Sequence, residues 1–133
     1  MNQEIILVSG PVIVEDDKVL LNQHGDTNFW KFCGGSTKDF NTRLTKIAER
    51  KVLDEMGIKI NILNENPFIQ YTAKNLETGI ADVILVHFLA ERIGEIQPRE
   101  DIRDWKWIPL KDLETEDLAP NIIPALRHFN FIK

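Results

Sequence analysis

Residues 49–60 read ERKVLDEMGIKI, a run in which two basic residues are followed by two acids and a glycine. In a helix, a rotation of about 100° per residue places Lys51, Asp54 and Glu55 on one side. The preceding positions on that side hold the apolar residues Leu44, Ile47 and Ala48. An ordinary amphipathic helix keeps its stripe apolar to the end, so we predict that both acids face a cleft. The alternative is that they are solvated and paired with Lys51 at three and four residues.

The segments around this helix predict a mixed fold. The helix is expected from about Asn41 to Met56, with Gly57 as a left-handed cap. Alternation predicts strands over 4–15, 18–23, 58–64, 67–75, 81–91 and 104–110, with a hairpin turn at 16–17 and a closing helix over 120–131. Strands on both sides of a central helix predict an α/β fold, in which a mixed sheet packs between helices.

Composition indicates the number of domains, the kinds of partner and the compartment. The chain has 133 residues, 43% hydrophobic and 28% charged, which predicts one domain over residues 1–133. A net charge of -5 opposes non-specific binding to nucleic acid or an anionic membrane, and the apolar runs are too short to span a bilayer. A single cysteine, Cys33, fits a reducing, cytoplasmic compartment.

The stretch from Gly35 onward resembles the signature of the Nudix hydrolase family, G-x5-E-x7-R-E-U-x-E-E-x-G-U, in which U is aliphatic. The matching positions are Gly35, Arg50, Val52, Asp54, Glu55, Gly57 and Ile58. A tryptophan before the double glycine and the late segment RDWKWIPLKDL are similar to the family's plan, so the resemblance covers nearly the whole chain. It implies an α/β/α sandwich and metal-dependent hydrolysis of a nucleoside diphosphate linked to another moiety.

Two features depart from that signature. The interval before Arg50 is one residue longer, so the first glutamate of the signature falls on Asn41 or Thr42, and neither supplies a charge for the arginine. Asp39 is a candidate partner instead. The glutamate after the arginine, a metal ligand or base in the family, is Lys51 here. A hard divalent ion takes about six oxygen ligands, and an ammonium group supplies none.

The resemblance implies a set of site residues. Mg²⁺ or Mn²⁺ would be held by the backbone carbonyl of Gly35 and by the carboxylates of Asp54, Glu55 and Asp101. Glu55, Asp101 and Glu100 are the candidates for the catalytic base, since the family often places a further acid in this late loop. The alternative for Glu100 and Asp101 is that they are solvated loop acids.

Three residues are candidates for binding substrate. Lys51 and Arg50 would contact phosphate, and Trp30 would stack on a base because planar rings stack on one another. For Trp30, a place in the core is the alternative.

Two functions follow. The first is a Nudix-type pyrophosphohydrolase, weakened by the altered signature, that acts on a small nucleotide or nucleoside diphosphate derivative. The alternative is a catalytically impaired nucleotide-binding or sensor module in which Lys51 neutralises phosphate in place of the metal. We place the hydrolase first because a base can be supplied from several loop positions. The sequence does not decide between a monomer and a homodimer.

Overall fold

The computed structural model describes residues 4–25, 27–99 and 101–133, which form strands and three helical segments. Their order is β1 (Ile5–Val12), β2 (Val14–Glu15), β3 (Lys18–His24), β4 (Lys31–Phe32), β5 (Gly35–Thr37), α1 (Leu44–Met56), β6 (Lys59–Ile62), β7 (Phe68–Leu76), β8 (Gly79–Ile93), β9 (Ile102–Pro109), the 3-10 helix η1 (Leu110–Thr115) and α2 (Ile122–His128).

The strands form two sheets. In the larger sheet, β1 pairs in parallel with β8 and antiparallel with β5, while β6 and β7 pair antiparallel with different stretches of β8. In the smaller sheet, β3 pairs antiparallel with β2, β4 and β9. The predicted mixed sheet is confirmed, because the larger sheet contains both parallel and antiparallel pairs.

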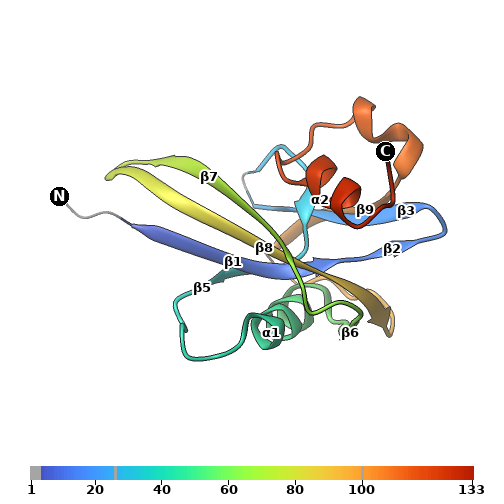
Figure 1. Ribbon diagram of the computed structural model, residues 1–133, viewed down its shortest axis with the longest axis horizontal. Coiled ribbons are helices and arrows are strands. Elements are labelled where there is room, and N and C mark those ends of the chain that lie inside the picture. Colours follow the sequence, from blue (N-terminus) through green and yellow to red (C-terminus); the bar gives the residue numbers. More distant parts are fainter. Residues whose placement is uncertain (1–3, 26, 100) are drawn as a thin grey trace.

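The two α-helices lie on opposite sides of the sheets. Figure 1 shows α1 below β1 and β8, and α2 above them beside β3 and β9. Each helix covers its own apolar core: Ala48, Val52 and Met56 of α1 pack in one, and Ala125 and Leu126 of α2 in the other. The arrangement is an α/β/α sandwich. Neither helix of the described chain is long and apolar enough to cross a membrane.

Helix α1 begins three residues later than the sequence predicts. The side chain of Asp39 accepts hydrogen bonds from the backbone N–H of Asn41 and the hydroxyl of Thr42, which holds the preceding segment in a turn. Its C-terminus agrees with the prediction, because Gly57 adopts a left-handed conformation with φ of 68°.

The first strand pairs differently from the predicted hairpin. A turn does form at Asp16 and Asp17, both with positive φ, but only the short β2 pairs with β3 across it. Strand β1 instead pairs along its whole length with β8, so that it lies inside the larger sheet. The burial of β1 increases along the strand, from an exposed Ile5 to the buried residues 9–12.

Two glycines allow β1 and the segment before β5 to cross closely. Gly34 has a φ of 130°, and a Cβ added to it would lie 2.5 Å from the carbonyl oxygen of Ser9. A Cβ on Gly10 would collide with the carbonyl of Cys33. The crossing therefore requires glycine at both positions, and it carries the backbone of residues 34 and 35 to the end of α1.

Candidate functional site

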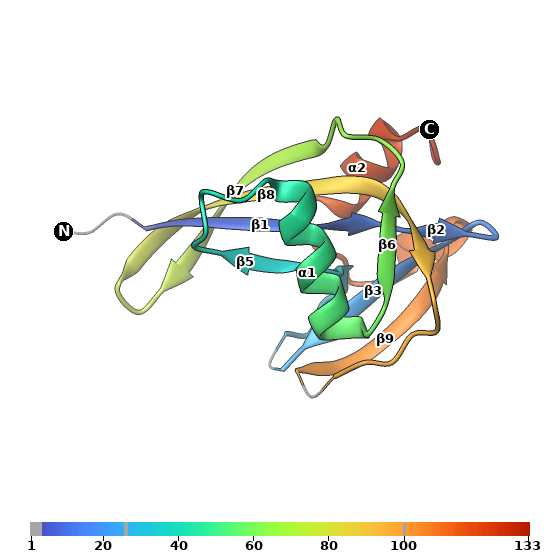
Figure 2. The same cartoon turned by 90° about the horizontal axis from the view of Figure 1, so that it is seen from below.

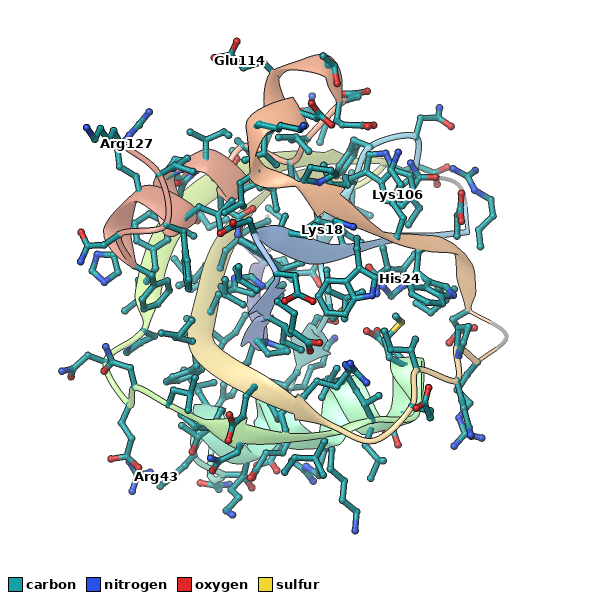
Figure 3. All side chains as sticks on the ribbon, turned by 90° about the vertical axis from the view of Figure 1, so that its right-hand side faces the viewer. Lys18, His24, Arg43, Lys106, Glu114 and Arg127 are labelled. Carbon is teal, nitrogen blue, oxygen red and sulfur yellow. The ribbon has the colours of Figure 1, made fainter. Side chains whose placement is uncertain are left out.

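Glu55, in the last turn of α1, is the acid that the fold encloses. Its side chain is 13% exposed. One carboxylate oxygen accepts a hydrogen bond of 3.2 Å from the backbone N–H of Gly34, and the other lies 3.5 Å from Nε2 of His24. Figure 3 shows His24 between the ribbons of β3 and α1. Three distant parts of the sequence thus meet at one carboxyl group.

The surroundings of Glu55 bring its ionisation into the neutral range. Burial raises the pKa of the carboxyl to about 7, and the charge of Asp101 adds to this rise. The hydrogen bond from Gly34 and the charges of Lys31 and Lys51 act in the opposite direction. A carboxyl with such a pKa exchanges a proton readily at physiological pH.

Two lysines and a histidine surround this carboxyl. Lys31, on β4, is partly buried, and burial lowers its pKa while the charge of Glu55 raises it. Lys51 lies one turn before Glu55, and a Cβ added to Gly35 would be 3.2 Å from Lys51 Cδ and 3.3 Å from Glu55 Oε2. Burial lowers the pKa of His24, and the charge of Lys31 lowers it further, so its imidazole is neutral at pH 7. The cations of this cluster are therefore lysines.

A cavity of about 550 Å³ opens beside the cluster. Its lining includes His24, Gly25, Asp101 and Arg103. The guanidinium of Arg103 donates hydrogen bonds to the carbonyls of Gly25 and Thr27 and to the side chain of Gln23. Arg103 of β9 thereby fixes the loop that follows β3. His24 is the last residue of β3, so its position is fixed as well.

The chain matches the family model described as the NUDIX domain over residues 7–129. It belongs to the Nudix family. The curated proteins contain no significant sequence match to it.

Solved Nudix structures share its fold at low sequence identity. A NUDIX-family hydrolase from Clostridium perfringens is 19% identical with a TM-score of 0.74, over 100% of both chains. The MutT NUDIX hydrolase from Burkholderia pseudomallei is 21% identical with a TM-score of 0.73, over 94% of this chain and 98% of its own. An ADP-ribose pyrophosphatase from Streptococcus suis is 22% identical with a TM-score of 0.65, over 92% and 87%. These similarities show the Nudix fold.

The Nudix fold brings four of the predicted site residues together. Gly35, Lys51 and Glu55 are neighbours, and the charge of Asp101, which lines the cavity, raises the pKa of Glu55. These residues come from β5, from α1 and from the turn before β9. Glu100, the other predicted loop acid, lies outside the described residues.

The remaining predicted residues lie elsewhere. Asp54 is exposed and forms no hydrogen bond or ion pair within the described part of the chain, so of the two predicted acids of α1 only Glu55 lies in the cluster. Arg50 is exposed and bonds Asp39 at 3.2 Å, which confirms the predicted partner. Trp30 is buried at 8% exposure beneath Lys106, whose ammonium lies 4.7 Å from the ring centre. Such a ring has little free surface for a base.

The described residues do not fit the divalent ion that the resemblance implies. No group of three or more His, Cys, Asp or Glu side chains in residues 4–25, 27–99 and 101–133 is arranged to hold a metal. Glu55 lies close enough to Lys31 and Lys51 for the charges of both to lower its pKa. An ion that needs about six oxygen ligands would meet ammonium groups instead.

Three residues of the cluster and of the cavity beside it are not among the predicted site residues. His24 is presented by β3, Lys31 by β4 and Arg103 by β9, so all three belong to the smaller sheet. The signal available in the sequence was a lysine inside the aromatic run FWKF, where a core strand would hold an apolar residue. The sequence gives no sign that these strands face α1.

Proposed function

We propose that this chain, as a single Nudix domain, binds a nucleoside diphosphate derivative through its phosphates and does so without a resident divalent ion. The observation that carries the proposal is that two lysines, Lys31 and Lys51, lie near enough to the enclosed carboxyl of Glu55 for both charges to act on its pKa. Ammonium groups are point charges that bind phosphate well. The geometry therefore favours the binding module over the hydrolase that sequence reasoning placed first.

The charges of the site support an anionic ligand. Lys31 and Lys51 place two ammonium groups near a carboxyl that accepts a proton near neutral pH, so the carboxyl offsets their charge only in part. The guanidinium of Arg103 lines the same space. The cavity of about 550 Å³ also lies within the size range of small-molecule sites, roughly 300 to 1,000 Å³.

The ligand class rests on the relatives of the same fold. The Streptococcus suis protein is an ADP-ribose pyrophosphatase. A UDP-X diphosphatase is likewise similar, at 18% identity and a TM-score of 0.67, over 96% of this chain and 62% of its own. Both names specify a nucleoside diphosphate joined to another group, and we propose the same class here.

Calorimetry with ADP-ribose in the presence of EDTA tests this proposal. The wild type should bind without metal, and Lys31→Gln and Lys51→Gln should each weaken binding by about tenfold, roughly 1.4 kcal/mol. Lys46→Gln is the matched control, because Lys46 lies on the same helix but is exposed and pairs with Glu49. Binding that requires Mn²⁺, or equal affinity in all three variants, would contradict the proposal.

Slow hydrolysis is a second candidate function, favoured by the pKa of Glu55. A carboxyl that has a pKa of about 7 and lies 3.5 Å from His24, a residue of the cavity wall, has the properties of a general base. Turnover of ADP-ribose with added Mg²⁺ or Mn²⁺ should then rise with pH through about 7 and disappear in Glu55→Gln. Asp54→Asn should retain it. Turnover that persists in Glu55→Gln would exclude Glu55 as the base.

A further inference from the structure

The connection between β8 and β9 is fastened to the end of α1 by backbone hydrogen bonds. The N–H of Gln97 donates to the carbonyl of Met56 at 2.7 Å. The N–H of Arg99 donates to the carbonyl of Glu55 at 2.8 Å. The last carbonyls of an α-helix have no partner inside the helix, so these bonds satisfy two of them. Figure 2 shows the connection running past the C-terminal end of α1. The turn that carries Glu55 is therefore also held from outside the helix.

The same connection continues to the cavity wall. The N–H of Ile102 donates to the carbonyl of Arg99 at 3.1 Å, just before β9 begins. The carbonyl of Asp101 accepts a hydrogen bond of 3.4 Å from the N–H of Gly25, the residue after His24. Asp101, Gly25 and His24 all line the cavity. Backbone hydrogen bonds thus join the end of α1, through this connection, to the end of β3.

Gly57 leaves room for this contact. A Cβ added to it would lie 2.7 Å from the carbonyl oxygen of Gln97 and 3.0 Å from the Cβ of that residue, closer than a real side chain approaches. The left-handed cap alone does not require glycine, because asparagine also adopts this conformation at helix ends. Glycine at position 57 is therefore required by the neighbouring segment as well as by the end of the helix.

We propose that Gly57 is a positioning residue of the site, which acts by leaving room for residues 97–99 against the end of α1. A side chain at position 57 pushes Gln97 away, which loosens both bonds to α1 and displaces Asp101 in the cavity wall. The consequence for ligand binding rests on the proposed function. The consequence for the backbone contacts does not.

The connection, rather than the helix, moves when this contact is lost. Met56 and Ile58, on either side of Gly57, are completely buried in the core. Gln97 and Arg99 are exposed, and residues 95–99 form neither a strand nor a helix. Segments with few buried contacts are the first to open in a folded protein. The position of the cavity wall therefore depends on the two bonds to α1.

Hydrogen exchange of the full chain tests this positioning without a ligand. In the wild type, the amides of Gln97 and Arg99 should exchange at least about tenfold more slowly than in an unstructured peptide. Gly57→Asn should remove this protection, because asparagine suits the cap but adds a Cβ. Gly79→Asn is the matched control, since Gly79 has a φ of 132° but a Cβ there meets nothing within 4 Å. Unprotected amides in the wild type, or equal protection in the two variants, would overturn the proposal.

Calorimetry with ADP-ribose in the presence of EDTA tests the consequence for the site. Gly57→Asn should weaken binding by about tenfold, and Gly79→Asn should stay within about twofold of the wild type. Absence of binding by the wild type would contradict the proposed function, and the exchange experiment alone would then decide the role of Gly57. Wild-type affinity in Gly57→Asn, together with loss of amide protection, would show that residues 97–99 do not position the site.

Discussion

Replacing Glu55 by glutamine should make the protein more stable at alkaline pH. The pKa of this carboxyl is about 7 in the folded protein, against an ordinary value of 4.5, with burial as the main cause. Between these values the folded state binds more protons than the unfolded state, so the free energy of unfolding falls as pH rises. Glutamine has no charge to desolvate, and its carbonyl can still accept the hydrogen bond from Gly34.

The size of the effect follows from the same shift. A rise from 4.5 to about 7 corresponds to at most about 3 kcal/mol above pH 8. Well below pH 4.5, where the carboxyl is protonated in both states, Glu55→Gln should differ little from wild type. The gain should appear progressively between these limits. The ionised carboxylate of Glu55 would then lower the free energy of unfolding. Such a cost is common for residues that are selected for function rather than for stability.

Urea denaturation followed by tryptophan fluorescence, at several pH values from acid to alkaline, measures this difference. Asp54→Asn is the matched control, because Asp54 is the adjacent acid of α1 but is exposed. Its stability should stay within about 0.5 kcal/mol of wild type at every pH. The reasoning is refuted if Glu55→Gln is less stable than wild type at alkaline pH, or if its difference from wild type does not change with pH.

Three further predictions concern neighbouring residues. Gly34→Ala should lower the free energy of unfolding by about 2–5 kcal/mol, because the backbone has a φ of 130° and the new Cβ would meet Ser9; an unchanged urea midpoint would contradict this. Lys51→Glu should tighten Mn²⁺ binding by about tenfold or more in calorimetry, since a carboxylate replaces an ammonium group; equal affinity would show that Lys51 is no obstacle to metal. Cys33 is buried, and burial raises the pKa of its thiol, so the native protein should not react with a thiol reagent until it unfolds; rapid labelling would place the thiol at the surface.

Local sequence signals predicted the elements of the fold well. Gly57 ended α1 as expected because a left-handed cap depends on residues within one turn. The start of α1 was misplaced because the side chain of Asp39 holds residues 41 and 42 in a turn that competes with the helix. The parallel pairing of β1 with β8 joins residues more than seventy positions apart, and no local pattern specifies such a partner.

The site was harder to predict for a geometric reason. Adjacent residues of a helix differ by about 100° in direction, so Asp54 and Glu55 share a broad side without sharing a pocket. The structure shows that only Glu55 is enclosed, because the buried face of α1 runs through Val52 and Met56 rather than through Lys51. Lys31 and His24 reach Glu55 through strand pairing in the smaller sheet. Their proximity to Glu55 depends on the tertiary fold, and the spacing of residues in the sequence does not predict it.

The crossing of Gly10 and Gly34 has a consequence for interpreting other chains of this fold. Both glycines are required by backbone contact alone, so a descendant that no longer used the site would still have to keep them. No backbone contact requires a particular residue type at the charged positions around Glu55. In a set of diverging Nudix sequences, glycine should therefore persist at positions 10 and 34 because the architecture requires it, while the residues at positions 51, 54 and 55 should vary with what the site still does.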